Sequence, residues 1–344
     1  IVLGPFMDEM FGGVGVVMSA FTRQLCFTNA AVFFTFLYYT FYAPISTAVP
    51  MMWQAQTILA ALILAWNLIE AISVEALVIF YARFNVALYS FFSVSLMAAP
   101  SFFFGTPSPI AYWSVWGDLS LCAARGLGVG LFGFMAVGYY FHREAMCKLL
   151  TVFNVINIVL FSLPAFFGGE SAVVPMWLIQ LLVTVPSLVI GIYIEVIGAT
   201  GPWSLAMALP KFGANVDTFN FVSLIWFVPF ILGFYIDPSF FGPSTPLPFP
   251  LFLDELNETT EWFFRAWVTS MLLVVLAPYV FGLNEERSLG VAKQLTMMYL
   301  GTVVLFTYGL LTTSTMNMVM AVPTTVANTL FVAAGVYLSL PQTS

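Results

Sequence analysis

The stretch from Met146 to Phe167 reads MCKLLTVFNVINIVLFSLPAFF, and it decides the fold class. Its single charged residue, Lys148, lies near its start. A helix of about 20 apolar residues crosses the hydrocarbon core of a bilayer, because lipid offers no partners for backbone polar groups. The sequence therefore predicts a membrane-spanning helix at this position.

Similar stretches fill most of the chain. Hydrophobic residues make up 61% of its 344 residues, charged residues make up 7%, and the mean hydropathy is +0.99. This apolar share is well above that of an ordinary soluble domain. We predict an all-α, polytopic transmembrane bundle of about ten spans, namely Leu25–Val49, Met52–Phe80, Val86–Phe104, Leu119–Tyr140, Met146–Phe167, Val173–Ile197, Phe219–Ile236, Trp262–Phe281, Gly290–Thr313 and Met316–Leu340.

Positive charge sorts to alternate gaps between these spans. If the N-terminal side is called X, seven of the nine basic residues fall on X, namely Arg23, Arg83, Arg143, Lys148, Lys211, Arg287 and Lys293. Arg125 and Arg265 fall on the opposite side, Y. An excess of Lys and Arg marks the cytoplasmic side of a membrane protein. We therefore expect both termini on the cytosolic side, or on the stromal or matrix side of an organelle membrane.

Two parts of the sequence resemble each other. The segment Ala99–Gly105 (APSFFFG) matches Asp237–Gly242 (DPSFFG), and a Pro/Ser/Thr-rich loop follows each segment. The next span in each part carries an early arginine, and a short charged turn and a lysine follow it. This pattern predicts two parallel four-helix repeats, residues 86–198 and 219–344, joined by a linker, 199–218. Residues 1–85 are predicted to form an N-terminal region with about two further spans.

Acidic residues inside spans are candidates for chemistry, because a buried charge is costly in lipid. Glu70, with Asn67 one turn before it, and Glu195 are the candidates here. They are predicted to contact a pigment, for example as a carboxylate ligand to the magnesium of chlorophyll, or to bind a cation. The alternative is that Glu70 and Glu75 mark a solvated helix break and that Glu195 lies close to the X surface.

Three other features have structural interpretations. Asn154 and Asn157 share one helix face, and such amides usually bridge neighbouring helices. Arg125 and Arg265 are predicted to pair with Asp118 and Glu261 or to bind lipid headgroups. The Asn-Glu-Thr sequon at residues 257–259 fits either glycosylation or a chance match.

Motifs for catalysis are missing from the sequence. It has one histidine, His142, and three cysteines without metal-type spacing, and it lacks a phosphate-binding loop, a GxSxG elbow and an HExxH motif. A net charge of −7 argues against nucleic-acid binding. We therefore expect a protein that is not an enzyme and has no metal centre.

The aromatic content suggests what surrounds the spans. Thirty-seven phenylalanines supply large apolar contact area, which suits lipid tails, carotenoids, chlorophyll rings or neighbouring subunits. The sequence favours a non-catalytic accessory or scaffold subunit of a larger membrane complex, and our most specific hypothesis is a photosystem–antenna supercomplex in the thylakoid. Membrane lipids and other membrane subunits are its expected partners, and chlorophyll, carotenoid or lipid its candidate cofactors. The alternative is a small-solute or lipid transporter whose site lies between the repeats and uses Glu70, Arg125 or Arg265.

Overall fold

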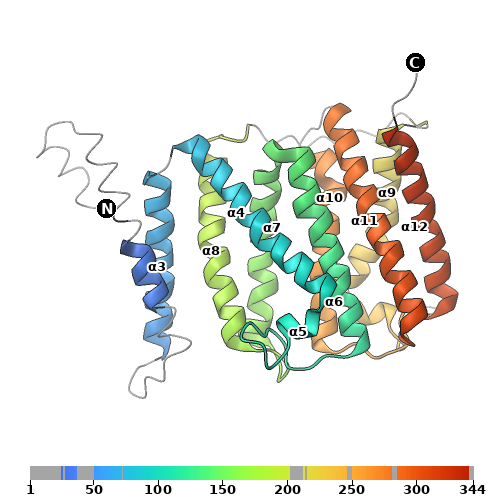
Figure 1. The fold of residues 1–344 in the computed structure, drawn as a ribbon, viewed down its shortest axis with the longest axis horizontal. Helices are drawn as coiled ribbons and strands as arrows, with labels where there is room; N and C mark the ends of the chain where they lie inside the picture. Colours follow the sequence, from blue (N-terminus) through green and yellow to red (C-terminus); the bar gives the residue numbers. More distant parts are fainter. Residues whose placement is uncertain are drawn as a thin grey trace, which may run out of the picture.

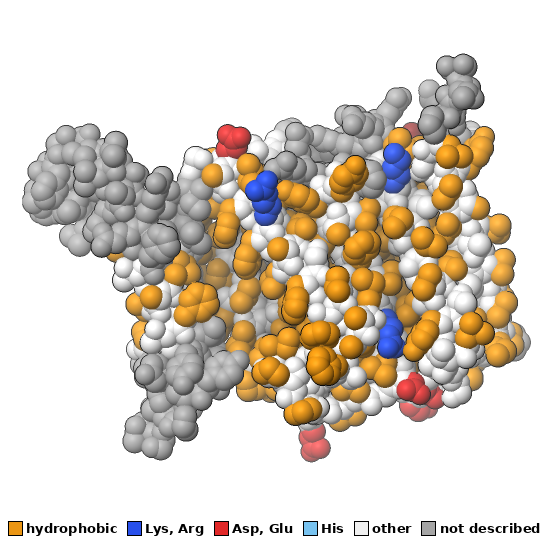
Figure 2. Space-filling model, in the orientation of Figure 1, with side chains coloured by type: hydrophobic (Ala, Val, Ile, Leu, Met, Phe, Trp, Pro, Cys, Tyr) orange, Lys and Arg blue, Asp and Glu red, His pale blue; other side chains and the backbone are white. Residues whose placement is uncertain are grey.

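A computed structural model describes residues 25, 28–36, 50–71, 73–201, 212–213, 215–245, 250–280 and 285–340. In this part of the chain the long helices stand side by side and run between an upper and a lower edge (Figure 1). Eight of them are long and apolar enough to cross a bilayer. The visible flank is largely hydrophobic, and charged side chains lie toward the two edges (Figure 2). This is the architecture of an all-helical integral membrane protein.

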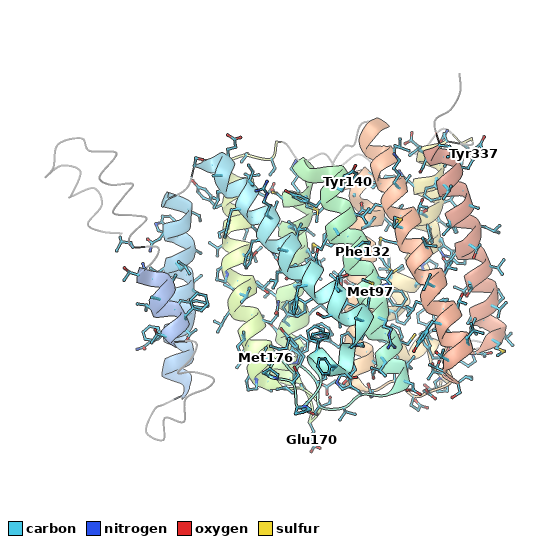
Figure 3. All side chains as sticks on the ribbon, viewed as in Figure 1. Met97, Phe132, Tyr140, Glu170, Met176 and Tyr337 are labelled. Carbon is cyan, nitrogen blue, oxygen red and sulfur yellow. The ribbon has the colours of Figure 1, made fainter. Side chains whose placement is uncertain are left out.

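The helices fall into two groups along the chain. The first group consists of α3 (Pro50–Ala71), α4 (Val74–Ala98), α5 (Pro100–Phe104), α6 (Asp118–Leu131), the π-helix η1 (Phe132–Val137), α7 (Gly138–Phe167) and α8 (Val174–Val196). The second group consists of α9 (Val216–Ile236), the 3₁₀-helix η2 (Pro238–Phe241), α10 (Glu258–Val280), α11 (Glu285–Thr312) and α12 (Met318–Ser339). Tyr140 lies near the upper edge (Figure 3), where one span, Asp118–Tyr140, gives way to the next, Met146–Phe167.

The prediction is confirmed for the later spans and is wrong in detail for the earlier ones. From Leu119 onward, the predicted boundaries agree with the candidate spans to within about four residues. Residues 28–36 of the first predicted span are helical, and residues 37–49 lie outside the described part. The predicted spans Met52–Phe80 and Val86–Phe104 have the wrong boundaries, because the chain leaves one helix at Ala71 and begins the next at Val74.

The break before α4 has a local cause. Ser73 caps the new helix, since its hydroxyl accepts a hydrogen bond from the backbone N–H of Ala76 at 3.4 Å. Glu75 lies in the first turn, where the helix dipole favours negative charge, and its side chain is exposed. A helix break therefore lies between Glu70 and Glu75. The predicted domain boundary at residue 86 falls inside α4.

Labelled residues mark the two edges of the bundle. Glu170 lies at the lower edge, whereas Tyr140 and Tyr337 lie near the upper edge (Figure 3). Arg83, which was predicted to lie in a gap between spans, belongs to α4 instead. It is exposed, and its Nε donates to the Tyr139 hydroxyl at 3.5 Å. Arg23 and Lys211 lie outside the described residues.

Apart from α3, which packs on α8, the main helix pairs within the two groups are similar. In the first group α4 packs on α6 and α7 packs on α8, and in the second group α9 packs on α10 and α11 packs on α12. The two groups meet along α6 and α10, which pack against each other. Each of these two helices also contacts a further helix of the other group: α6 contacts α11, and α10 contacts α7.

Small residues close the contact between α6 and α10. A Cβ atom at Gly126 would lie 2.6 Å from Cε3 of the Trp267 ring, and one at Gly130 would collide with the Ser270 side chain. Glycine lets two helix backbones approach closely, which is how membrane helices gain packing contacts without a hydrophobic driving force. The centre of the bundle is therefore tightly packed along this seam.

Polar contacts join the two groups at the lower edge. One carboxylate oxygen of Glu258 accepts from the backbone N–H of Gly169 at 2.8 Å, and the other accepts from the Ser171 hydroxyl at 2.6 Å. Asn257 caps α10, since its Oδ1 accepts from the Thr260 N–H at 2.8 Å and also from the Ser120 hydroxyl at 3.2 Å. Asn257, the asparagine of the predicted sequon, thus has a structural role as a helix cap.

Candidate functional site

Buried polar side chains gather inside the first group of helices, between α4, α7 and α8. We call the following residues the polar network: Tyr81, Asn85 and Tyr89 of α4; Thr151, Asn154 and Asn157 of α7; Gln180 and Ser187 of α8; and Tyr112 of the loop before α6. All of them are buried. Spacings of three and four residues place the members from each helix on one face, toward the neighbouring helices.

Asn154 lies at the centre of this network. Its amide nitrogen lies 3.2 Å from the Tyr81 hydroxyl, 3.4 Å from Oδ1 of Asn85 and 3.1 Å from the Ser187 hydroxyl. Its Oδ1 accepts from the Tyr89 hydroxyl at 3.4 Å. These contacts confirm that Asn154 bridges helices, and they connect α4, α7 and α8 deep inside the bundle.

The network continues from Asn154 toward the lower edge. Asn157 donates from its amide to the Tyr89 hydroxyl at 3.1 Å, so the second predicted bridging residue is confirmed as well. The Tyr112 hydroxyl donates to Oε1 of Gln180 at 2.8 Å. Tyr112 lies in a loop outside the spans, and burial raises the pKa of its phenol, which keeps it a neutral hydrogen-bond donor.

A cavity of about 60 Å³ adjoins the lower end of the network. Tyr89, Asn157 and Gln180 contribute its polar groups, and Tyr112 closes it from the loop. The remaining wall is apolar and mostly aromatic: Phe92, Leu96, Phe104, Trp113, Leu127, Leu131, Phe153, Phe161, Trp177, Trp262, Phe263 and Ala266. Trp177 and Trp262 meet with ring centroids 4.6 Å apart, so α8 and α10 close one wall together.

The second group of helices has a smaller cavity of its own. It measures about 30 Å³, and its lining includes Phe227, Thr302 and Thr324 where the first cavity has Tyr89, Asn157 and Gln180. The threonine hydroxyls bond within their own helices, to the carbonyls of Met298 at 2.9 Å and Met320 at 2.8 Å.

Aromatic packing replaces most of the polar network in this second group. The Tyr299 ring stacks on Phe331 at 4.5 Å and on Phe227 at 4.9 Å between centroids. The same helix arrangement therefore forms around an aromatic stack in one group and around a hydrogen-bonded network in the other.

The structure does not gather the predicted site residues into this region. Asn67 is buried in α3, and Glu195 lies in the last turn of α8, where its carboxylate accepts from the Thr200 hydroxyl at 2.9 Å. Helices α3 and α8 are neighbours, so these two residues belong to adjacent elements. Glu70 lies in α3, and its side chain is outside the described residues.

The two repeat-related arginines make structural contacts. Arg265 forms an ion pair with Glu261 at 3.3 Å, as predicted. The guanidinium of Arg125 lies 5.1 Å from the centre of the Tyr308 ring, which is cation–π geometry. The predicted partner of Arg125 was Asp118, so the described contact differs from the prediction. Neither arginine lines the two cavities described above.

Sequence reasoning missed most of the network. Tyr81, Asn85 and Tyr89 recur at every fourth residue within an apolar span, and this spacing is the signal that would have found them. Gln180 and Ser187 carry a weaker signal, as isolated polar residues in α8.

Comparison of the chain with protein-family models, curated proteins and solved structures finds no match.

Proposed function

We propose that the chain is a non-catalytic scaffold or accessory subunit that packs laterally against other components of a larger membrane complex. The closed seam between α6 and α10 is the observation that carries this proposal. Gly126 and Gly130 leave no space opposite Trp267 and Ser270, so the centre of the bundle is built for rigidity. Rigid seams suit a protein whose role is to hold neighbours in place.

The outer faces of the helices support lateral packing. Phe91 of α4 is 51% exposed, Phe102 of α5 is 75% exposed, and Phe167 at the end of α7 is 82% exposed. Large side chains also project from α12, including Met318 and Leu330. Exposed aromatic and aliphatic groups fit lipid tails, flat pigments or the helices of another subunit.

We further propose that the bundle arose by duplication and contains ten spans in all. Two hydrogen-bond patterns at the lower edge support the duplication. The backbone N–H of Tyr112 donates to the Phe104 carbonyl at 2.8 Å, and the N–H of Leu251 donates to the Phe241 carbonyl at 3.0 Å. One residue further on, Trp113 and Phe252 donate to the same two carbonyls.

Helix packing repeats in the same way. Gly191 of α8 packs on Thr151 of α7, and Gly335 of α12 packs on Thr296 of α11. The distance along the sequence from the first glycine–threonine pair to the second is about the same as the distance from Tyr112 to Leu251 in the loops. On this view the first repeat begins near Val74, where α4 starts, and the second near Val216.

We also propose a host assembly and an orientation of the chain in the membrane. A photosystem–antenna supercomplex in the thylakoid remains our specific suggestion, because flat aromatic side chains suit chlorophyll or carotenoid. Asn67, Glu70 and Glu195 remain the suggested pigment or cation contacts. The sorting of basic residues supports cytosolic or stromal termini.

A transporter is the second candidate, and one feature favours it. The cavity in the first group is closed partly by Trp262 and Ala266 of α10, so both groups contribute to its wall. A substrate site between repeats has this character. A cavity of about 60 Å³ holds only about two water molecules, however, and the residues first suggested for transport do not line it.

Gentle purification distinguishes the two candidates. A scaffold subunit is expected to leave the membrane in a complex of fixed stoichiometry, with its partners or pigments. A transporter is expected to migrate alone and to catalyse solute flux when reconstituted into vesicles. Flux by the lone chain would overturn the proposal.

A further inference from the structure

The cavity beside Asn157 and Gln180 combines buried polar groups with open space. Both side chains line it, and they are only 3% and 5% exposed. Buried amides in proteins are almost always hydrogen-bonded, either to protein or to a bound molecule. The hydrogen-bonding capacity of these two amides therefore indicates what the cavity holds.

Each of the two amides has a hydrogen-bond donor or acceptor that the described contacts do not use. A carboxamide has two N–H donors and an oxygen that accepts two hydrogen bonds. Among the described residues, Asn157 uses one N–H toward Tyr89, and Gln180 uses its oxygen toward Tyr112 and its amide also toward the Tyr89 hydroxyl. A guest in the cavity thus meets the amide oxygen of Asn157, the second N–H of Gln180, and the indole N–H of Trp113, which has no hydrogen-bond partner among the described residues.

The guest must be neutral. The residues that line the cavity include no Asp, Glu, Lys or Arg. An ion placed among amides, phenols and aromatic rings in the bilayer interior has no counter-charge, and its desolvation is too costly. Neutral molecules with one donor and one acceptor satisfy the site without that cost.

The size and shape of the cavity limit the guest further. About 60 Å³ accommodates about two waters or a molecule of about four heavy atoms. Aromatic rings such as Phe92, Phe161 and Trp177 form flat walls, which pack best against a planar molecule.

We propose that this cavity is a binding site for a small, neutral, planar molecule of the carboxamide class. Its carbonyl oxygen accepts from the amide of Gln180, and its N–H donates to the amide oxygen of Asn157. The site is independent of the scaffold role, because it lies in the interior of the bundle and uses none of the outer faces.

The second group of helices provides an internal control. Thr302 and Thr324 occupy the matched positions, and their hydroxyls are already bonded to helix carbonyls. The cavity there is about half as large. We therefore expect that the second cavity does not bind this guest. The substitutions Asn157→Thr and Gln180→Thr give the first cavity the threonine side chains of the second.

Acetamide is the probe for this site. A ligand with only four heavy atoms is expected to bind with a Kd no tighter than about 40 μM. The full chain in detergent is titrated with acetamide to tens of millimolar, and its Tm is measured. We expect a saturable rise in Tm, because a ligand that binds only the folded state stabilises it.

Acetone has the same number of heavy atoms as acetamide but no N–H donor, and we expect it to bind at least tenfold more weakly. Asn157→Thr and Gln180→Thr should each abolish the acetamide response while retaining a cooperative transition without ligand. If either variant fails to fold, Ala266→Val fills the cavity from α10, keeps both amides, and should also remove the response. An unresponsive wild-type chain, equal binding of acetone, or an unchanged response in the variants would each overturn the proposal.

Discussion

Gly126 of α6 lies directly against the indole ring of Trp267 of α10, so close that a methyl group at position 126 would lie 2.6 Å from the ring. Gly126→Ala is therefore expected to force the two helices apart or to move the ring. Overpacking of this kind typically costs about 1–3 kcal/mol. The expected result is a lower Tm of the purified chain in detergent.

Gly117→Ala is the matched control for that substitution. A Cβ atom at Gly117 meets nothing within 4 Å, and this glycine precedes the same helix. Its Tm should stay close to that of the wild type. Equal losses at positions 117 and 126 would contradict a tight seam between the two groups of helices.

Asn154→Leu removes the centre of the polar network. Tyr81, Asn85, Tyr89 and Ser187 each lose a hydrogen-bond partner inside the bundle. We expect a loss of about 1–3 kcal/mol in the free energy of unfolding, since buried polar groups without partners are costly. Unfolding by denaturant, followed by tryptophan fluorescence, measures this loss.

Asn328→Leu serves as the comparison, because Asn328 makes one described side-chain contact, with the indole of Trp226 at 3.2 Å. Its effect should be clearly smaller than that of Asn154→Leu. A network that is merely incidental would give similar values for both variants.

Glu258→Ala is expected to loosen the lower edge. This carboxylate holds the backbone of Gly169 and the hydroxyl of Ser171, which belong to the other group of helices. Hydrogen exchange of residues 168–172 should increase, while exchange in α12 stays unchanged. Glu255→Ala, an exposed acid in the same loop, should leave both regions as they are.

Asp237 gives the lower edge a pH-dependent contact. Hydrogen bonds from the Ser239 hydroxyl and then from its backbone N–H lower the pKa of Asp237 below its usual value of 3.8. Its contribution to stability is thus present above pH 3.8 and is lost as the pH falls through the lower, folded-state pKa.

Ser239→Ala removes the larger of the two causes. The variant should lose this contribution at a higher pH than the wild type does, and Asp237→Asn should lack this part of the acid dependence altogether. Melting temperatures between about pH 2 and pH 5 test both expectations. Identical acid profiles for all three proteins would refute the role of this contact.

The fold was largely predictable because lipid imposes a simple rule on sequence. Long apolar runs such as Met146–Phe167 had to be helices, and their predicted ends match the structure. The error at Met52–Phe80 arose because the apolar character continues through the break, so hydropathy does not mark it. The cap by Ser73 and the acid at Glu75 were the local signals for a new helix.

The candidate site was less predictable, for a physical reason. A spanning helix is apolar on every side, so its sequence does not distinguish the face that meets lipid from the face that meets another helix. Asn154 and Asn157 stood out because amides need partners in lipid. Tyr81 and Tyr89 did not, because a tyrosine in a span also suits the membrane interface. Gln180 joined them only through folding, which brings α8 beside α4 and α7.

We propose that this chain is a rigid subunit that holds membrane neighbours through its outer faces. Native mass spectrometry after mild solubilisation from its own membrane is the sharpest test of this role. We expect a complex in which the chain is present in fixed ratio with other membrane subunits, with or without pigment. A lone chain that carries a solute across reconstituted vesicles would contradict it.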